Sequence, residues 1–301
     1  MRQDGLLLVD KPIGMTSHDV VSRLRKVFQT RKIGHAGTLD PDASGLLLVC
    51  VGDATRLIEY MVADDKAYEG EIHFGVQTDT DDATGQVIAK ESAAALTNAN
   101  LREVERLFRG ELEQQVPKYS AVHIDGERAH ALARAGIDFV PPVRLVCIHQ
   151  LSFEPLIHSS DGAEATARFF VACSKGTYIR SLCRDVGVTL RVPAHLSGLR
   201  RVKSGYASID AAVSLDELGQ SSQPHMYLRN PRVGLLHLSS LNLDEGDVTR
   251  LALGQKIVVA KRLSSPLLLV LLDGEIAAIV MAESHDNGTL LKPRKVFWKR
   301  R

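Results

Sequence analysis

Short apolar runs separated by amphipathic and polar segments predict alternating strands and helices at the start of the chain. The run GLLLV at residues 5–9 predicts a strand. Apolar side chains then recur at helical spacing, and Thr16 or Ser17 is placed to cap the resulting helix. The recurring positions are Val20, Val21, Leu24, Val27 and Phe28.

The pattern of apolar and polar residues also predicts strands and a helix in the next segment of the chain. Residues 46–51 form an uninterrupted apolar run, which predicts a buried strand, and residues 54–61 predict a short helix. Residues 66–77 alternate in part between apolar and polar positions and predict a long strand. The polar segment 79–85 predicts the turn of a hairpin or a connection at a sheet edge.

The middle of the chain combines regular elements with one long irregular segment. Residues 111–142 show little periodicity except around 129–135, and they carry several aromatic and basic side chains. We interpret them as a long functional excursion from the sheet. The regular elements predicted here are a helix at 101–108 followed by Gly110, strands at 143–153 and 165–173, and a helix at 177–186 ended by Gly187.

A change of pattern near residue 236 predicts two domains. Residues 219–236 are polar and irregular, and a smaller β-rich unit follows them. We therefore expect a large domain at 1–236 and a small one at 237–301. The large domain has no regular βαβ spacing and no G-x-G-x-x-G turn, so an α+β fold with a mostly antiparallel sheet is predicted. The elements of the small unit are a short helix within 241–254 and strands at 256–259, 267–272 and 275–281.

The composition of the 301 residues, 45% hydrophobic and 24% charged, is that of an ordinary globular protein. No apolar run approaches the roughly 20 residues that span a bilayer, and the N-terminus lacks a secretion-type apolar region. We therefore expect no membrane association and a cytoplasmic location. The four cysteines include no C-x-x-C pair, so reduced, mostly buried thiols are expected rather than a zinc knuckle or a disulfide framework.

The distribution of charge is more informative than the formal net charge of +1. Acidic residues concentrate between positions 64 and 82, whereas basic residues gather in three groups, which predicts a polarised surface able to bind nucleic acid. The groups are Arg23, Arg25, Lys26, Arg31, Lys32 and His35; Arg191, His195, Arg200, Arg201 and Lys203; and Lys292, Arg294, Lys295, Lys299, Arg300 and Arg301.

One carboxylate lies on an unusually constrained turn. Residues 33–48 read IGHAGTLDPDASGLLL, and they place Asp40 just before an apolar run. Glycines at 34, 37 and 45 allow backbone conformations or close approaches that a side chain would forbid, and Pro41 fixes the backbone directly after the acid. Taken alone, an Asp-Pro step is also compatible with an ordinary capped turn.

Four motifs in this order resemble the TruB family of pseudouridine synthases, bacterial enzymes that isomerise a uridine in the T-loop of tRNA. The resemblance extends over nearly the whole chain. It implies an α+β catalytic domain around a central mixed, mainly antiparallel sheet, and a small C-terminal PUA-like RNA-binding domain. The motifs are GLLLVDKPIGMTS at 5–17, KIGHAGTLDPDASGLLLVCVGDATRL at 32–57, DKAYEG at 65–70 and KGTYIRSLCRDVG at 175–187, supported by QVPKYSA at 115–121 and LKPRKVF at 291–297.

The resemblance also implies the catalytic groups. Asp40 would be the catalytic aspartate, which adds to the ribose or stabilises its positive charge while the bond between C1′ and N1 breaks. Arg180 would pair with Asp40 and orient it. Tyr68 would stack on the target uracil, near its C5 proton. No metal or redox cofactor is implied, and direct attack on the sugar and elimination to a glycal both remain open.

A stacked T-loop uridine cannot reach an aspartate, so the enzyme must flip the nucleotide out of the RNA. By the resemblance, His35 would occupy the vacated place, while Tyr178 and Leu199 would contribute to the pocket for the base. The glycines of the Asp40 turn would then let the RNA backbone and the flipped nucleotide come close.

Basic residues would hold the T-stem and loop of the tRNA by their phosphates. The excursion at 111–142 departs from the family pattern because His123 and His130 stand where Lys and Tyr are usual, which leaves the roles of both histidines open. We expect no obligate protein partner and a monomer. The residues expected to bind RNA are Arg23, Lys26, Arg31, Lys32, Arg128, Arg134, Arg200, Arg201, Lys292 and Arg294.

Three other functions are compatible with parts of this pattern. A guide-RNA-dependent pseudouridine synthase shares the aspartate motif, but it would carry surfaces for partner proteins. A non-catalytic tRNA-binding or folding protein would have no need for intact Asp40, Tyr68 and Arg180. A nucleoside hydrolase would be expected to show an Asp-rich metal motif, which this sequence lacks.

Overall fold

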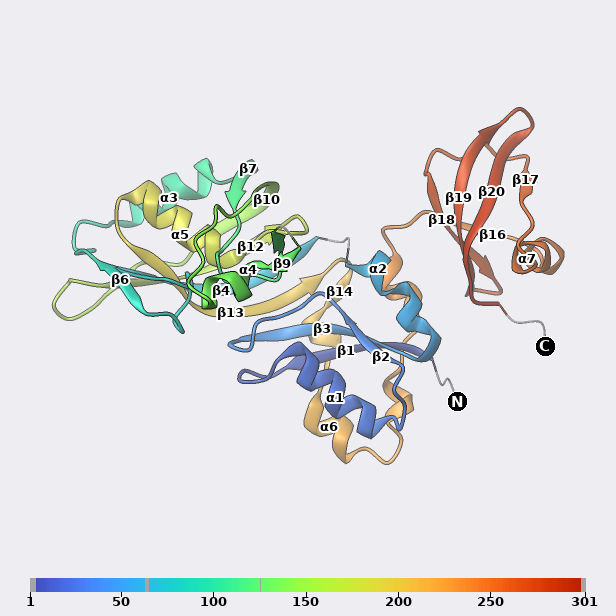
Figure 1. Ribbon diagram of the computed structural model, residues 1–301, viewed down its shortest axis with the longest axis horizontal. Coiled ribbons are helices and arrows are strands. Elements are labelled where there is room, and N and C mark those ends of the chain that lie inside the picture. Colours follow the sequence, from blue (N-terminus) through green and yellow to red (C-terminus); the bar gives the residue numbers. More distant parts are fainter. Residues whose placement is uncertain (1–3, 63–64, 125, 299–301) are drawn as a thin grey trace.

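The computed structural model describes residues 4–62, 65–124 and 126–298 (Figure 1). Within these residues an eleven-stranded sheet forms the large domain, and a five-stranded sheet forms the C-terminal one. The long path of the main sheet is β15 (Val213–Ser214), β1 (Gly5–Lys11), β3 (Ala43–Val51), β13 (Ala194–Ser204), β4 (Lys66–Phe74), β12 (Ala165–Cys173), β10 (Val143–Phe153) and β7 (Gly110–Gln115).

The main sheet is mixed and mainly antiparallel, which confirms the predicted fold class. Among the described strands of this sheet, only the pairs β1 with β15 and β3 with β13 are parallel. Three short strands pair off the main path: β2 (Ile33–Ala36) with β3, β11 (Ile157–His158) with β12, and β14 (Ala207–Ser208) with β13.

Helices and short hairpins complete the large domain. The helices are α1 (Ser17–Val27), α2 (Ile58–Met61), α3 (Asn98–Leu107), α4 (Ala129–Arg134), α5 (Ile179–Leu190) and α6 (Leu215–Gln220), with 3-10 turns at Gly52–Leu57, Ile209–Ala211, Pro224–Tyr227 and Pro231–Leu235. The hairpins are β5 (Val76–Thr78) with β6 (Val87–Lys90) and β8 (His123–Ile124) with β9 (Glu127–Arg128).

Helix α1 forms where the apolar spacing predicts it. Thr16 is the cap: its hydroxyl accepts from the backbone N–H of Asp19 at 3.0 Å, and the Asp19 carboxylate accepts from the backbone N–H of Thr16 at 2.9 Å. Val20, Val21 and Leu24 are buried against the sheet. The cap and the apolar face together fix this helix on the side of the sheet that carries the Asp40 turn.

Several predicted boundaries are corrected, each for a local reason. Gly187 does not end α5, which continues to Leu190. A Cβ at Gly187 would lie 2.7 Å from the carbonyl oxygen of Val192, so this glycine permits close packing instead of a cap. The long strand predicted at 66–77 is divided at Gly75, whose φ is 104°. The helix predicted at 54–61 is a 3-10 turn followed by α2.

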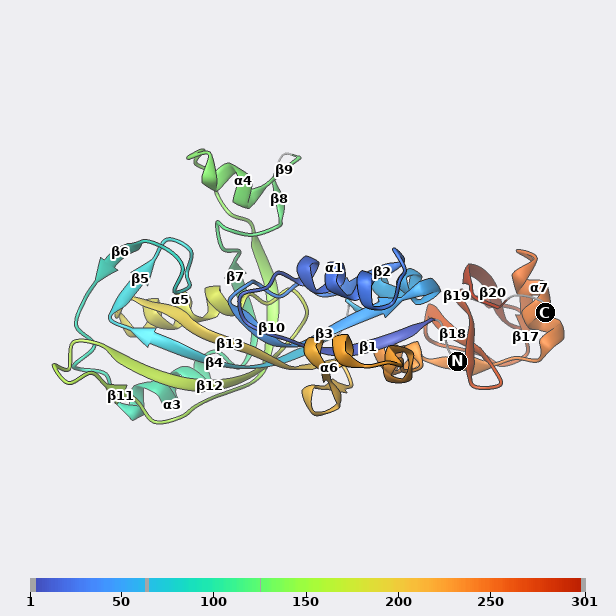
Figure 2. The same ribbon diagram turned by 90° about the horizontal axis from the view of Figure 1, so that it is seen from below.

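The irregular excursion is shorter than predicted. Residues 111–115 belong to β7, which pairs with β10, so the excursion proper occupies 116–142 and carries β8, β9 and α4. Figure 2 shows it rising from the sheet on the same side as α1. The excursion and α1 therefore cover the same face of the sheet.

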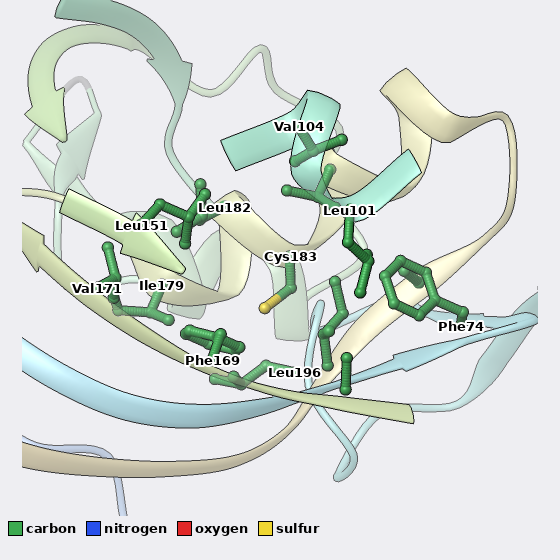
Figure 3. Packing of buried hydrophobic residues seen from close by; sticks show 14 of the residues in the cluster. Phe74, Leu101, Val104, Leu151, Phe169, Val171, Ile179, Leu182, Cys183 and Leu196 are labelled. Atoms are coloured by element: carbon green, nitrogen blue, oxygen red, sulfur yellow. The ribbon is translucent and has the colours of Figure 1, made fainter. Parts of the chain in front are cut away.

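An apolar cluster beneath the excursion fixes α3 and α5 on the sheet. Leu101 from α3 and Leu182 from α5 pack toward Phe169 and Leu196 of the strands (Figure 3). These side chains are nearly or fully buried. Because α5 begins at the edge of this cluster, its packing also fixes the residues at its N-terminus, Tyr178 and Arg180.

The C-terminal sheet confirms the predicted small β-rich domain. Its order is β16 (Ser240–Asn242), β18 (Leu267–Leu272), β19 (Glu275–His285), β20 (Gly288–Val296) and β17 (Ile257–Val259), and α7 (Glu245–Ala252) packs on it. Leu269, Leu271 and Ile279 belong to the same buried cluster as Leu6 and Leu8 of β1. The two sheets therefore share part of their core.

In the described ranges, no helix has the length and apolar character needed to cross a membrane. The four cysteines are free, and Cys50, Cys173 and Cys183 are buried. The burial of these three thiols agrees with the expectation from the sequence.

Candidate active site

A cavity of about 920 Å³ lies between the Asp40 turn, the excursion and the start of α5. Five of the residues predicted to act on the substrate line it, although they are spread over some 160 positions of the chain. They are Asp40, Tyr68, Tyr178, Arg180 and Leu199. The sheet brings them together because β4 and β13, which carry Tyr68 and Leu199, are neighbours at its centre.

The Asp40 turn is held by a hydroxyl and a buried ammonium group. The hydroxyl of Ser17 accepts from the backbone N–H of Leu39 at 2.9 Å and donates to its carbonyl oxygen at 3.1 Å. Lys11 is fully buried, and its amine donates to the carbonyls of Met15 at 2.6 Å and Pro41 at 3.2 Å. Burial lowers the pKa of Lys11, while the nearby Asp42 and Asp40 oppose that shift.

Arg180 connects the Asp40 turn to two other segments. Its Nε lies 3.3 Å from Oδ2 of Asp40, and its Nη1 lies 3.3 Å from Oδ2 of Asp82. Nη2 donates to the carbonyl of Tyr119 at 3.0 Å, at the base of the excursion. The guanidinium is nearly buried, whereas the Asp40 carboxylate is half exposed toward the cavity. Arg180 thus orients the carboxylate and leaves it accessible to a ligand.

The loop at 79–85 supplies partners for both arginines on α5, and reasoning from sequence missed this role. Asp82 pairs with Arg180, and Asp81 pairs with Arg184 at 3.0 Å. Asp81 has a positive φ of 61°, and burial raises the pKa of its carboxyl while Arg184 opposes the shift. One signal in the sequence could have indicated this role. The spacing of Arg180 and Arg184 places two guanidinium groups on one face of a helix, and such groups pair with carboxylates when they are buried.

Tyr68 and Arg201 form the floor of the cavity. Tyr68 is 8% exposed, and burial raises the pKa of its phenol, with the adjacent Arg201 opposing the shift. Arg201 is only 1% exposed. Its Nε donates to the carbonyl of Leu46 at 2.7 Å and its Nη2 to that of Gly37 at 3.0 Å. Arg201 is therefore buried rather than at the surface, and its guanidinium ties the Asp40 turn to the sheet; its contact with RNA stays a prediction.

The glycines of the turn also serve the protein's own packing. A Cβ at Gly45, whose φ is 102°, would lie 2.3 Å from the carbonyl oxygen of Arg201. A Cβ at Gly34 would lie 2.8 Å from Ile58. At both positions a close protein neighbour leaves no room for a side chain, and the expected approach of RNA to this turn stays a prediction.

Tyr178 is held by a side chain that the sequence did not single out. The buried amide of Gln114 donates to the Tyr178 carbonyl at 3.1 Å and accepts from its backbone N–H at 2.8 Å. Ser181 and Arg184 donate to the carbonyl of Gln115, at 2.8 and 3.0 Å. The end of β7 therefore anchors the first turn of α5, next to Arg180.

The structure places the predicted histidines in different surroundings. His35 lies on β2, opposite Val49, and is not among the residues that line the cavity. Burial lowers the pKa of His35, and Arg201 and His18 add to the shift. His130 lines the cavity, with Nδ1 3.0 Å from the carbonyl of Ser120, whereas His123 is exposed on β8.

Cations outnumber carboxylates around the cavity, which favours an anionic ligand. Among the other basic residues predicted to bind RNA, Arg134 lines the cavity, and Lys26, Arg31, Arg128 and Arg294 are exposed. Four more have carboxylate partners: Arg23 with Asp216 at 2.7 Å, Lys32 with Asp53 at 3.3 Å, Arg200 with Asp10 at 2.7 Å and Lys292 with Glu283 at 2.5 Å. The charged residues that line the cavity are Lys66, Arg134, Arg144, Lys175, Arg180 and Arg201 against Asp40 and Glu59.

Comparison with known proteins identifies the class of the chain. Residues 25–179 match the family model of the TruB pseudouridylate synthase N-terminal domain, and residues 180–230 match that of the tRNA pseudouridylate synthase B C-terminal domain. The chain is therefore a pseudouridine synthase, an isomerase.

Curated relatives and solved structures agree with this class. The chain is 38% identical to tRNA pseudouridine synthase B of Streptococcus thermophilus strain CNRZ 1066, over 97% of this chain and 98% of that one. It is also 38% identical to tRNA pseudouridine synthase B of Oceanobacillus iheyensis, over 97% of each. The archaeal box H/ACA Nop10-Cbf5 complex contains a similar fold, with a TM-score of 0.73 at 23% identity over 98% of this chain and 86% of that one. The chain belongs to the TruB family.

Proposed function

We propose that this protein converts a uridine in the T-loop of tRNA to pseudouridine. The observation that carries the proposal is the Asp40 carboxylate, which is half exposed in a cavity rich in cations and lies 3.3 Å from Nε of Arg180. Relatives at 38% identity that are named tRNA pseudouridine synthase B support tRNA as the substrate.

The reaction is an isomerisation, so every atom of the substrate remains in the product. The bond between ribose C1′ and uracil N1 breaks, the base rotates within the cavity, and C5 bonds to C1′. C5 then loses its proton and N1 gains one. Asp40 supplies negative charge to the ribose, either by adding to it or by stabilising a cationic sugar. Arg180 keeps the carboxylate oriented and balances its charge before the sugar arrives.

Tyr68 and Leu199 hold the detached base while it turns. Both lie on central strands and line the cavity beside Asp40. The raised pKa of Tyr68 keeps its phenol neutral, so its ring offers a flat apolar surface to the uracil. Tyr178 adds a second wall, fixed through the main chain by Gln114. These walls retain the base without forming a covalent bond to it.

The uridine reaches the cavity by flipping out of the RNA. His35 lies outside the cavity, where its imidazole could occupy the place that the base leaves. Its lowered pKa keeps the ring neutral, which suits stacking between bases. Phosphates on either side of the flipped nucleotide would be bound by Arg134 and by three exposed residues: Lys26 of α1, Arg31 between α1 and β2, and Arg128 of the excursion. The C-terminal sheet would bind RNA as a PUA-like domain, and the protein would act as a monomer without a protein partner.

The relatives favour this function over the guide-RNA alternative. The Nop10-Cbf5 structure is 23% identical to the chain, and that likeness extends to the fold alone. Incubation of the protein with an unmodified tRNA transcript, followed by mapping of pseudouridine, tests the proposal. Pseudouridine at one T-loop position in the absence of any guide RNA is the expected result. No pseudouridine in any of several tRNA transcripts would contradict it.

A further inference from the structure

A second carboxylate lines the cavity that the proposed RNA substrate would enter. Glu59 lies on α2, lines the cavity and is half exposed. An uncompensated carboxylate here would repel the RNA backbone, and repulsion between exposed charges extends over about 8–10 Å at physiological salt. The cavity therefore contains one acid, Asp40, that the proposed chemistry uses, and one, Glu59, that it does not use.

The C-terminal sheet supplies a cation to this carboxylate. Lys295 of β20 forms an ion pair with Glu59 and donates to the carbonyl of Arg56 at 2.8 Å. Its amine also lies 5.4 Å from the ring centroid of Tyr60. The hydrogen bond from Lys295 lowers the pKa of Glu59. Lys295 was part of the basic C-terminal cluster in the sequence, but its charge is directed to the protein rather than to the solvent.

The contact is reciprocal, so the position of Lys295 is well fixed. Arg56, one turn before Glu59, donates to the carbonyl of Val296 at 2.8 Å, and its guanidinium lies 4.7 Å from the ring centroid of Phe297. Figure 1 shows α2 on the side of the main sheet that faces the C-terminal sheet. The Lys295 side chain is 24% exposed. One face of the segment at 52–61 thus contacts β20 while Glu59 borders the cavity.

We propose that Lys295 neutralises the negative charge of Glu59, so that this wall of the cavity does not repel an RNA phosphate. The C-terminal domain then affects RNA binding in the cavity through the charge of one side chain. This effect is separate from any contact that the domain itself makes with RNA. The inference rests on the proposed function, because it assumes that RNA enters the cavity.

The test is a double-mutant cycle on the full-length chain. Dissociation constants for an unmodified tRNA transcript are measured in an Asp40→Asn background, so that the RNA is not converted, for the parent, Lys295→Met, Glu59→Gln and the double variant. Lys256→Met is the matched control, since it removes the same charge from an exposed position of the same domain that does not line the cavity.

Lys295→Met should weaken binding roughly 5-fold at about 50 mM salt and less than about 2-fold at about 0.5 M, because screening removes the repulsion by unmasked Glu59. Glu59→Gln should bind within about 2-fold of the parent, and the double variant should recover to the same level. Lys256→Met should have less effect than Lys295→Met.

Three outcomes would overturn the proposal. A double variant as weak as Lys295→Met, or a loss that does not depend on salt, would mean that Lys295 acts only by docking the domains. Unchanged binding by Lys295→Met would mean that the charge of Glu59 does not repel the RNA even without Lys295. If Lys295→Met lowers the melting temperature, Lys295→Gln replaces it, because the amide can still donate to the Arg56 carbonyl without carrying charge. Pseudouridine formation by the wild-type protein, measured in parallel, tests the proposed function separately.

Discussion

Nη1 of Arg180 lies 3.3 Å from Oδ2 of Asp82, a carboxylate that is not among the residues lining the cavity. Asp82 is itself fixed, because its Oδ1 accepts from the hydroxyl of Thr80 at 2.7 Å and from the backbone N–H of Thr84 at 3.0 Å. The orientation of Asp40 therefore depends on a loop that makes no contact with the substrate cavity.

Asp82→Asn should slow catalysis while binding is retained. The amide keeps the volume but loses the charge that positions Arg180, and we expect the single-turnover rate to fall about 10- to 100-fold, as a misplaced catalytic group predicts. The dissociation constant for tRNA should stay within about 2-fold. Asp79→Asn, on the same loop, is the control and should keep the rate. An unchanged rate for Asp82→Asn would show that Arg180 is positioned without it.

Asp40→Asn should abolish pseudouridine formation, with a loss of at least about 1,000-fold, because the amide can neither add to the ribose nor stabilise its positive charge. Binding of the T-loop transcript should remain largely intact. The rate and the affinity are measured on the same preparation, with Asp42→Asn as the neighbouring control. Turnover retained by Asp40→Asn would eliminate the assigned catalytic role.

Gln114→Met should affect both stability and rate. The thioether fills the space of the amide but leaves the N–H and C=O of Tyr178 without these partners, at a cost of about 1–3 kcal/mol in the free energy of unfolding. The start of α5 would then be less well fixed, and we expect kcat to fall by about 10-fold with KM little changed. Gln115→Met is the matched control because that side chain is exposed. Equal behaviour of the two variants in urea unfolding and in kinetics would refute the positioning role.

His195 should make the protein less stable in mild acid. The ring is buried, donates from Nδ1 to the carbonyl of Val76 at 2.8 Å and stacks on His73 at 5.0 Å. Burial lowers the pKa of His195 below its ordinary value of 6.5. Between the folded pKa and 6.5, the unfolded chain binds more protons than the folded chain, so the free energy of unfolding decreases as pH falls through this range, by at most about 1.4 kcal/mol per pH unit.

Urea unfolding of the wild type and of His195→Gln, between about pH 5 and pH 8, measures this contribution. As pH falls below 6.5, the free energy of unfolding of the wild type should decrease more than that of His195→Gln. Parallel pH curves would exclude His195 as the source.

Thiol reactivity should distinguish Cys147 from the other cysteines. Burial raises the pKa of Cys50 to about 12 and that of Cys173 to about 11, and it raises the pKa of Cys183 well above its ordinary value. Cys147 is partly exposed, and its Sγ lies 3.6 Å from Nδ1 of His149. An aromatic disulfide reagent should therefore modify one thiol per folded chain and the rest only after unfolding. Cys147→Ser should abolish the fast phase, and a fast phase that survives would contradict the assignment.

Strands were predictable where apolar residues run together or recur in alternation. The apolar run at 46–51 corresponds to β3, which is buried on both faces, and the segments at 143–153 and 165–173 correspond to β10 and β12. β13 escaped prediction although it lies at the centre of the sheet, because Arg200, Arg201 and Ser204 interrupt its apolar pattern. Those polar groups are satisfied by partners such as Asp10 and the carbonyl of Leu46, which no local pattern contains.

The residues of the candidate site were likewise predictable only in part. Asp40, Tyr68 and Arg180 were predictable because they stand within distinctive motifs, and the structure places all three on one cavity. Asp82 and Gln114 were not, because their importance depends on contacts with α5 across 98 and 64 positions of the chain. Such pairings arise from the packing of α5 on the sheet, which periodicity alone does not specify.

The shared core has a consequence for how the chain is made. β1 is synthesised long before β18 and β19, yet Leu6 and Leu8 belong to a cluster that includes Leu269, Leu271 and Ile279. One edge of β1 also stays unpaired until β15 at Val213–Ser214 has been made. An apolar surface on β1 thus remains uncovered until the strands of the C-terminal sheet are synthesised, and nascent chains with such surfaces are prone to aggregate. Prematurely terminated chains would expose this surface permanently, which would mark them for chaperones and proteases before they could compete with the full-length enzyme for RNA.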